Sequence, residues 1–303
     1  MPRSETSPWQ LGGLTWKQLG KRTWSETNSD DVFSRAAGLA FYFMLAIFPG
    51  LFFLVSLFGI VAQGNSELQN NLMRYISSVM PGDAAGLVSR TLQEIIQSSS
   101  GTKLWLGLLG ALWSASAGIS ALMDMLNITY DVKEGRAFWK KRLLAIGLTI
   151  AVAVLTLGAL VLILYGGRIA EGMFGTVGLG SVFAWVWKVA QWPAAISFVV
   201  LAYAIMYYAG PDVKQRKWYW ITPGAVIGVS LWLLASFAFR LYLNFFNSYS
   251  QTYGALGGVI ILMLWLYVTA LAILIGSEAN SEIEHAAAEH GEVEAKAPGQ
   301  KVA

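Results

Sequence analysis

Residues 38–54 read GLAFYFMLAIFPGLFFL, and this uncharged run, with Pro49 and Gly50 set inside it, decides the fold class. A helix rises about 1.5 Å per residue, so roughly 20 apolar residues cross the hydrocarbon layer of a bilayer, which is about 30 Å thick. The run and its apolar flanks reach that length. Proline removes a backbone hydrogen bond and presses on the carbonyl four residues earlier, here that of Leu45. We therefore predict a membrane helix that is kinked or broken at Pro49.

The composition of the whole chain is that of a membrane protein. Of its 303 residues 55% are hydrophobic and only 13% are charged, whereas a water-soluble domain usually has about 25% charged residues. Six apolar stretches are long enough to span a bilayer. We predict an all-α, polytopic membrane protein whose six transmembrane helices cover about residues 36–62, 103–123, 143–165, 182–209, 221–245 and 257–279.

The basic residues predict the orientation and the domain organisation. Thirteen lysines and arginines fall in the N-terminal arm and in the loops 124–142 and 210–220, whereas four fall on the opposite side. Cytoplasmic loops carry the excess of basic residues, so both termini are expected in the cytoplasm. The expected parts are a cytoplasmic N-terminal arm 1–35, a transmembrane domain 36–279 and a charged cytoplasmic tail 280–303.

The charge and the residue types restrict the partners and the chemistry. The net charge of +3 arises from basic residues collected at membrane edges. A nucleic-acid-binding protein would gather them on one folded face, so no nucleic acid is expected as a partner, whereas membrane lipids are. The chain has no cysteine, and both of its histidines, His285 and His290, fall in the expected tail. We expect no catalytic residue, no metal and no cofactor, and no histidine chemistry in the membrane part.

The first outer loop, residues 63–102, is expected to contain two short amphipathic helices. Apolar residues recur every three or four positions in two runs separated by Pro81 and Gly82. The two runs are Leu68, Leu72, Ile76 and Val79, and then Val88, Leu92, Ile95 and Ile96. Three arrangements fit such helices: they lie on the outer leaflet, cap the bundle, or pair subunits in a homo-oligomer.

Polar side chains within the spans follow helical spacing. The second span carries Ser116, Ser120, Asp124, Asn127 and Asp131 at intervals of three or four, which places them on one helix face. Polar groups inside a membrane usually face the protein interior or a water-filled path. The stripe is explained equally by a solute path and by close helix packing with acids at the membrane edge.

Two further charges lie within the spans. Arg240 sits about one turn from the outer end of the fifth span, where it provides a site for an anionic group or snorkels to the interface. Glu278 lies near the cytoplasmic end of the sixth span. Its neutralisation by Arg35, Lys141 or Arg142 is expected, and a role in proton coupling is the alternative.

Pro193 interrupts the fourth span as Pro49 interrupts the first. If the protein consists of two sets of three helices, these spans lead the two halves and enter the membrane from opposite sides. That is the geometry of an inverted repeat, in which interrupted helices mark the binding site of many transporters. Pro49, Gly50 and Pro193 are therefore candidate hinge residues.

Three motifs occur in order along the chain. They read AAGLAFYFMLAIFPGLFFL from residue 36, WSASAGISALMDMLNITYDVKEGRAFWKKRLLA from residue 113, and YGALGGVIILMLWLYVTALAILIGSEANSEIE from residue 253. Together they resemble the YihY/BrkB family of bacterial inner-membrane proteins over roughly residues 25–285. The family's hallmark positions fall on Ala40, Tyr42, Phe48, Pro49, Ser120, Leu122, Asn127, Tyr130, Arg136, Arg142, Pro211, Pro223, Gly224, Tyr253, Gly254, Trp265, Gly276, Glu278 and Asn280. One departure is Ala117-Gly118, where many relatives have a basic residue, so any role of that residue does not transfer.

The resemblance implies a multi-pass protein of the bacterial inner membrane, associated with virulence, serum resistance and transport of small or lipid-linked solutes. The family also carries an old ribonuclease BN label. A metal-dependent ribonuclease needs clustered histidines and carboxylates, which this sequence lacks, so we regard that label as unsupported and expect no enzyme activity.

Three functional hypotheses follow. The first is a transporter or exporter of a small polar or lipid-linked solute, with a path formed by Tyr42, Pro49, Ser120, Asp124, Asn127, Arg240, Tyr253 and Glu278. No nucleotide-binding P-loop is present, so transport would be secondary or would depend on a partner, with Asp124 and Glu278 as candidates for proton coupling. The second is a structural or envelope-assembly protein that docks a partner through the outer helices 66–98. The third, a lipid-modifying enzyme, lacks an evident nucleophile and base.

Overall fold

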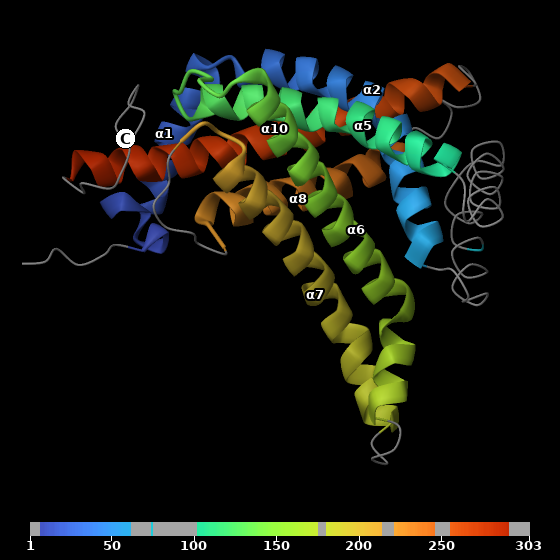
Figure 1. The fold of residues 1–303 in the computed structure, drawn as a ribbon. Coiled ribbons are helices and arrows are strands. Elements are labelled where there is room, and N and C mark those ends of the chain that lie inside the picture. Colours follow the sequence, from blue (N-terminus) through green and yellow to red (C-terminus); the bar gives the residue numbers. More distant parts are fainter. Residues whose placement is uncertain are drawn as a thin grey trace, which may run out of the picture. The chain divides into compact units, whose positions relative to one another are not determined.

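A computed structural model of the chain shows an all-helical protein (Figure 1). The structure describes residues 7–61, 74, 102–174, 180–213, 221–245 and 255–290. The helices are η1 (Pro8–Gly13), α1 (Trp16–Ser29), α2 (Val32–Val61), α5 (Thr102–Thr129), α6 (Phe138–Phe174), α7 (Gly180–Ala209), α8 (Pro223–Phe245) and α10 (Ala255–Glu289). All regular secondary structure in the described ranges is helical.

Six of the described helices, α2, α5, α6, α7, α8 and α10, are long and apolar enough to cross a membrane. The predicted six-span, all-α fold is therefore confirmed. The two amphipathic helices expected in the first outer loop fall outside the described residues. The cytoplasmic orientation of the termini stays a prediction.

The prolines do not interrupt their helices. α2 is helical through Pro49 and Gly50, and α7 is helical through Pro193. The break expected as one outcome at Pro49 does not occur. Long apolar helices in a membrane retain their remaining backbone hydrogen bonds, since hydrocarbon offers no other partner.

The chain divides into two compact units. The first contains Met1–Leu45, Gly118–Leu148 and Val200–Ala303, and the second contains Ala46–Ala117 and Thr149–Val199. α2, α5, α6 and α7 each contribute a segment to both units, whereas α8 and α10 belong to the first. In α2 the division falls after Leu45, whose carbonyl is the one that Pro49 deprives of its usual donor.

The second unit has a small apolar core of its own. Phe53 of α2, Leu108 and Ala111 of α5 and Ala153 of α6 are buried together. Gly50 of α2 also lies against α5, since a β-carbon at this position would be 3.9 Å from the Ala115 side chain. Small residues thus permit close approach of α2 and α5 in this unit.

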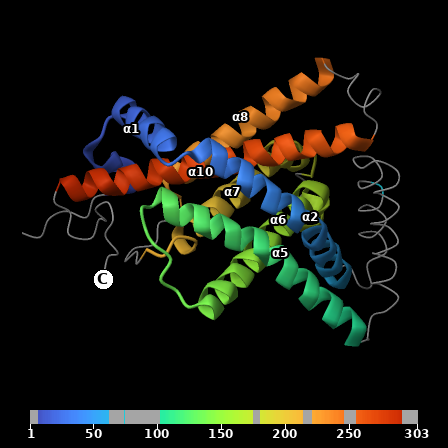
Figure 2. The ribbon, with the colours of Figure 1, turned by 90° about the horizontal axis from the view of Figure 1, so that it is seen from above.

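In the first unit, α8 packs across α10 (Figure 2). The contact is made through glycines: a β-carbon added to Gly224 would lie 2.2 Å from the carbonyl oxygen of Gly276. The i, i+4 spacing of Gly224 and Gly228 predicts such backbone contact. α8 begins at Pro223, and its N-cap is Thr222, whose hydroxyl accepts a hydrogen bond from the Ala225 amide at 3.2 Å.

The N-terminal arm is folded onto α10. α1 begins with a capping box, in which the Thr15 hydroxyl accepts from the Gln18 amide and the Gln18 side chain accepts from the Thr15 amide. η1 and α1 both contact α10, and Leu11 and Leu19 form a buried cluster with Ile283. The arm expected at residues 1–35 therefore contains ordered helices that the hydropathy pattern, which detects only long apolar runs, does not reveal.

Candidate functional site

The end of α10 is buried and polar. The helix continues to Glu289, ten residues beyond the predicted end of the sixth span. Its buried polar residues are Ser277, Glu278, Asn280, Ser281, Glu282 and His285. The charges from residue 280 onward predict a cytoplasmic tail. In the structure residues 280–289 continue α10, and Asn280, Ser281, Glu282 and His285 are buried. Asn280 bonds to Thr222 and Gly224 at the start of α8, whereas Glu282 lies near Arg22 of α1 and His285 near Asp131 in the turn after α5.

Five carboxyl groups gather beside this end of α10, and we refer to them as the acidic cluster: Glu26, Asp30, Asp131, Glu278 and Glu282. They come from α1 and its C-cap, from the turn after α5, and from α10. Burial raises the pKa of Asp30, and the negative charges of Asp131 and Glu26 raise it further, against the lowering effect of Arg35 and of a hydrogen bond with Glu278. Asp30 therefore takes up a proton more readily than an aspartate in water.

Glu26 responds to the same surroundings. Burial raises its pKa first, followed by the charges of Glu282 and Asp131, while His285 lowers it. The acids of α1 and α10 thus influence one another across the helix interface.

Glu278 is the most enclosed carboxyl of the cluster. It is 1% exposed, and its Oε1 atom has no hydrogen-bond partner among the described residues. Lys141 does not neutralise it, as its Nζ lies 2.5 Å from Oδ1 of Asp124. Arg35 donates a hydrogen bond to the carbonyl oxygen of Asp30. Within the described part of the chain Glu278 therefore has no ion pair.

His285 connects two of the acids. Its Nδ1 lies 3.1 Å from Oε1 of Glu282, and its Nε2 lies 3.8 Å from Oδ2 of Asp131. Protonation of the imidazole would therefore place a positive charge between two carboxylates. Glu282 is also 3.9 Å from Arg22, which belongs to α1.

Hydroxyl groups complete the buried polar surface. Thr23 and Thr27 lie one turn apart on α1, and Ser281 lies on α10. Their oxygen atoms are buried and have no hydrogen-bond partner among the described side chains and backbone groups. Buried hydroxyls of this kind usually bond to ordered water. The acidic cluster and these hydroxyls form a buried surface that can bind a proton.

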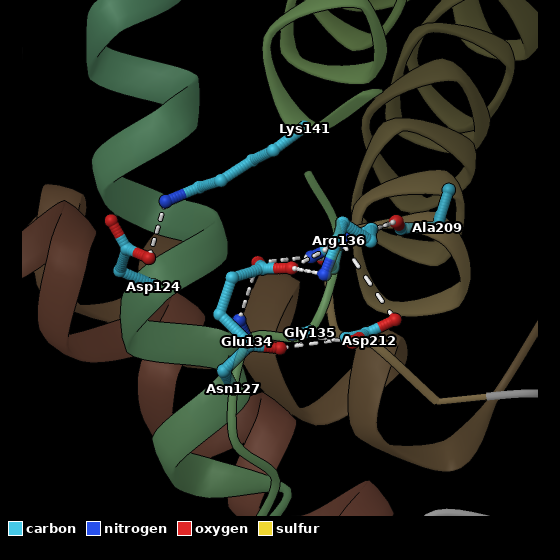
Figure 3. Close-up of polar contacts among 9 residues, drawn as sticks. Asp124, Asn127, Glu134, Gly135, Arg136, Lys141, Ala209 and Asp212 are labelled. Atoms are coloured by element: carbon cyan, nitrogen blue, oxygen red, sulfur yellow. Dashed lines mark hydrogen bonds and ion pairs between the residues drawn. The ribbon is translucent and has the colours of Figure 1, made fainter. Parts of the chain in front are cut away.

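A second polar assembly lies in the loop after α5 (Figure 3). The Nδ2 of Asn127 donates to Glu134 at 2.9 Å, and its Oδ1 accepts from the backbone amide of Asp212 at 2.7 Å. Arg136 donates to Glu134 through both Nε, at 2.8 Å, and Nη2, at 2.7 Å. Arg136 also donates to the carbonyl of Gly210 at 2.8 Å. We call Asn127, Glu134, Arg136 and Asp212 the loop clamp.

The loop clamp closes the end of α7. The carbonyls at the C-terminus of a helix lack partners within the helix and carry partial negative charge. Arg136 supplies donors to these carbonyls, while Asp212 accepts from the amide of Gly135 at 2.8 Å. The clamp thereby holds the loop between α5 and α6 against the end of α7.

Glu134 makes the stability of the loop clamp depend on pH. Burial would raise its pKa, but hydrogen bonds from Arg136 and Asn127 outweigh burial and lower the pKa to about 2. A carboxyl with a lowered folded-state pKa stabilises the fold above its unfolded pKa, about 4.3, and this contribution is lost as the pH falls toward 2. We expect the difference in unfolding temperature between the native protein and Glu134→Gln, measured in detergent, to shrink between pH 5 and pH 2. A difference that is independent of pH would contradict this assignment.

The structure distributes the predicted path residues over different surroundings. In the polar stripe of α5, Asp124 pairs with Lys141, Asn127 belongs to the loop clamp, and Asp131 lies near His285. Ser120 is half-buried, and Ser116 donates to the carbonyl of its own helix at Trp113. The residues of the stripe thus have different neighbours, and a solute path along them stays a prediction.

The remaining predicted residues do not join these groups. Tyr42 and Arg240 are exposed on α2 and α8, and Arg240 forms no ion pair within the described ranges. Of the candidate hinge residues, Pro49 and Gly50 are half-buried and Pro193 is exposed. Tyr253 falls outside the described residues.

Sequence reasoning missed most of the acidic cluster. It identified Glu278 but not Glu26, Asp30, Glu282 or His285 as its neighbours. Two signals were available: the capping box at Thr15, which predicts a helix in the arm, and the i, i+4 spacing of Thr23 with Thr27 and of Glu278 with Glu282. That the two polar faces meet depends on the tertiary packing of the first helix on the last.

Among the described residues, no three His, Asp or Glu side chains are arranged in a way that could hold a metal ion.

Comparison with known proteins gives consistent matches over most of the chain. Residues 23–300 match the family model described as virulence factor BrkB. A relative from Bacillus subtilis, named putative ribonuclease-like protein YfkH, is 33% identical over 248 residues, which cover 82% of this chain and 88% of the relative. A UPF0761 membrane protein from Xanthomonas campestris is 24% identical over 278 residues, which cover 88% of this chain.

The Xanthomonas relatives are longer proteins, since the match covers 60% of the UPF0761 protein from Xanthomonas campestris and 61% of the one from Xanthomonas axonopodis. No solved structure matches the chain. The fold and the geometry of the site described above therefore come from this chain alone.

Proposed function

We propose a transport function for this chain, which belongs to the virulence factor BrkB family of membrane proteins. In this proposal it is a secondary transporter that couples the movement of a solute to the movement of protons. The single observation that carries the proposal is the burial of Glu278, without an ion pair among the described residues, in a helix long and apolar enough to span a membrane.

The energetic cost of such a carboxyl supports a functional role. An ionised group in a low-dielectric interior costs several kcal/mol unless it is paired, so ionisable residues in spans are rare and usually belong to substrate or proton pathways. Purely structural stabilisation would be better served by an apolar residue of similar size. Glu278 therefore suits a group that binds and releases a proton as its surroundings change.

The neighbours of Glu278 give the proton a route. Asp30 shares a hydrogen bond with Glu278, and Asp131 is 43% exposed at its side chain. His285 lies between Asp131 and Glu282. We propose that protons reach the enclosed Glu278 from solvent by way of these neighbouring groups. We propose that this end of the protein faces the cytoplasm, since the basic residues concentrate there.

The class of solute is the less specific part of the proposal. A small polar or lipid-linked solute fits a family associated with the cell envelope, and no nucleotide-binding motif is present to supply energy. The name of the Bacillus relative suggests ribonuclease activity. We propose transport instead, because the chain has two histidines, both near its C-terminus, and no cysteine. The bacterial inner membrane is the proposed location.

Proton coupling is tested in proteoliposomes that contain a pH-sensitive dye. Solutes, both small polar compounds and lipid-linked compounds, are added outside, and solute-dependent acidification or alkalinisation of the lumen is recorded. We expect the native protein to move protons with at least one solute class and Glu278→Gln to reduce that movement to the level of empty liposomes. The amide keeps the size and the hydrogen bonds of the side chain but cannot release a proton.

The matched control is Glu289→Gln, which alters a carboxyl on the same helix that is 55% exposed at its side chain. This variant should retain proton movement. If Glu278→Gln elutes as a folded protein and moves protons as the native protein does, the role of Glu278 is wrong. If the native protein transports a solute, as direct measurement of solute flux would show, but no proton movement accompanies it, transport is not coupled to protons.

A further inference from the structure

α1 is joined to α2 by a short turn of fixed geometry. Only Asp30 and Asp31 separate α1 from α2, whose residues 32–54 form a candidate span. The turn is fixed: Asp31 has a φ of 50°, its carbonyl accepts from the Arg35 amide at 3.1 Å, and its side chain accepts from the Ser34 hydroxyl at 3.0 Å. α1 therefore ends only two residues before the candidate span begins.

One side of α1 packs against α10 (Figure 2). Leu19, Thr23 and Thr27, at intervals of four, are its buried residues. At the edge of this interface Arg22 donates two hydrogen bonds to Glu289, at 3.1 Å and 2.9 Å. These contacts fix the rotation of α1 about its own axis, and so fix which side chains point away from the protein.

The remaining surface of α1 combines tryptophan with lysine. Trp16 and Trp24 are 59% and 61% exposed, and Gly20 lies between them in the same row at four-residue spacing. Lys17 and Lys21 are exposed in the adjacent row. Within α1, all of which is described, no carboxylate occupies an exposed position, because Glu26 is half-buried. We call Trp16, Lys17, Gly20, Lys21 and Trp24 the Trp-Lys face.

Aromatic contact links the Trp-Lys face to the span. The ring of Trp24 lies edge-to-face with Phe33 in the first turn of α2, with 6.1 Å between the ring centroids. Trp9 of η1 is also half exposed, and its indole nitrogen donates to the carbonyl of Ile221 at 3.2 Å. Three exposed indoles therefore lie on the segment that leads into the first span.

We propose that the Trp-Lys face binds the head groups of anionic phospholipids, so that α1 lies in the plane of the membrane interface. Indole rings favour this zone because they have an apolar body and a polar N–H group. Lysines four residues apart attract phosphate, and no exposed carboxylate on the helix opposes them. Charge complementarity thus identifies the occupant as the anionic lipid surface, since a neutral apolar partner would leave both lysines without a counter-charge.

The absence of cysteine from the sequence allows a specific test with the full-length protein. In Gly20→Cys a nitroxide label stands in the middle of the Trp-Lys face, where an added side chain meets no atom within 4 Å. The protein is placed in nanodiscs of phosphatidylcholine, with or without phosphatidylglycerol. Electron paramagnetic resonance then measures how often the nitroxide collides with oxygen, which concentrates in lipid, and with a nickel complex, which stays in water. The ratio of the two collision rates gives the depth of the label. We expect the label to lie within the interface, and deeper when phosphatidylglycerol is present.

The matched control is Ser29→Cys, an exposed position on the same helix. It is nine residues, or two and a half helical turns, from Gly20, and so lies on the opposite side of α1. This label should remain accessible to the nickel complex in both lipids. Equal water accessibility of the two labels in both lipids would overturn the proposal.

The lysines are tested separately. Lys17→Gln with Lys21→Gln should remove the effect of phosphatidylglycerol on the label at position 20. A lysine near an anionic surface contributes about 1 kcal/mol, which corresponds to roughly fivefold in affinity per lysine. The label at position 20 could also be shielded from the nickel complex equally in both lipids, and more strongly at higher protein concentration. This result would indicate that a second copy of the chain covers the face, and it would also overturn the proposal. Neither result depends on whether the protein transports a solute.

Discussion

Replacement of Gly276 by alanine will lower the free energy of unfolding by about 1–3 kcal/mol, toward the upper end of that range. A β-carbon at this position would lie 2.5 Å from the hydroxyl of Tyr207, 2.7 Å from the carbonyl oxygen of Gly224 and 2.9 Å from the α-carbon of Gly228. Two of these three atoms belong to the backbone of α8, so α8 and α10 must separate to make room. A flexible side chain could yield, but a helix backbone cannot.

Tyr207 makes the same position sensitive in a second way. It is buried, and its hydroxyl donates to the carbonyl of Ile273 at 2.7 Å. A methyl group at Gly276 would push this hydroxyl aside and leave a buried donor unpaired, which adds to the cost.

The measurement is thermal unfolding in detergent, and Gly258→Ala is the matched control. Gly258 lies on the same helix, and an added β-carbon there meets no atom within 4 Å. Because alanine favours a helix over glycine by about 1 kcal/mol, the control should unfold at the native temperature or slightly higher. Equal unfolding temperatures for Gly276→Ala and Gly258→Ala would show that the helices are not in backbone contact.

Replacement of Arg136 is expected to cause the second large loss in the free energy of unfolding. Arg136→Met keeps much of the volume but removes the donors to Glu134 and to the carbonyls of Ala209 and Gly210. Loss of one partner of a fully buried pair costs about 3–5 kcal/mol. The Arg136 side chain is 15% exposed and that of Glu134 is 23% exposed, so we expect about 2–3 kcal/mol.

A double-mutant cycle distinguishes the ion pair from simple loss of packing. Once Glu134 is replaced by glutamine, Arg136→Met should cost less than it does in the native protein, because no unpaired carboxylate remains. Lys133→Met is the control for the loss of a basic residue in the same loop, as Lys133 is exposed. Additive costs for the substitutions at positions 134 and 136 would contradict the clamp geometry.

Local sequence patterns predict the parts of the fold that depend on local physics. The six spans follow from hydropathy and length, since a helix that crosses hydrocarbon must be apolar over about 20 residues. The start of α8 follows from Thr222 and Pro223, and its close approach to α10 from the spacing of Gly224 and Gly228. Each of these signals lies within a few residues of the feature that it predicts.

The acidic cluster could not be predicted in this way. Glu278 was recognisable because it is a charge in a span, but its partners are supplied by α1, some 250 residues earlier in the chain. Lys141 was an expected partner of Glu278 and instead pairs with Asp124, because both project from neighbouring helices in the first unit. Charge and spacing cannot decide between two acids that are both within reach of one lysine.

The hypothesis of a solute path along α5 also rested on helical spacing, which does not identify the tertiary partners of the side chains. Helical spacing placed Asp124 and Asn127 on α5, where they have different partners. Asp131 was assigned to the same face but lies in the turn after α5, with a φ of 49°, near His285. A shared face predicts proximity along a helix but not a common environment, since the environment is set by whichever elements pack above each turn.

The contact of α1 with α10 also determines the order of events during synthesis. α1 leaves the ribosome well before its partner residues near Glu289, which lie about 260 residues later in the chain. At about 5–20 residues per second, α1 waits roughly 15–50 s for that partner. During this interval its future interface is open to water. Of the side chains that α1 later buries, Thr23 and Thr27 tolerate water well, and Leu19 alone is apolar. A wholly apolar interface between α1 and α10 would expose more apolar surface, and so favour aggregation, during each round of translation.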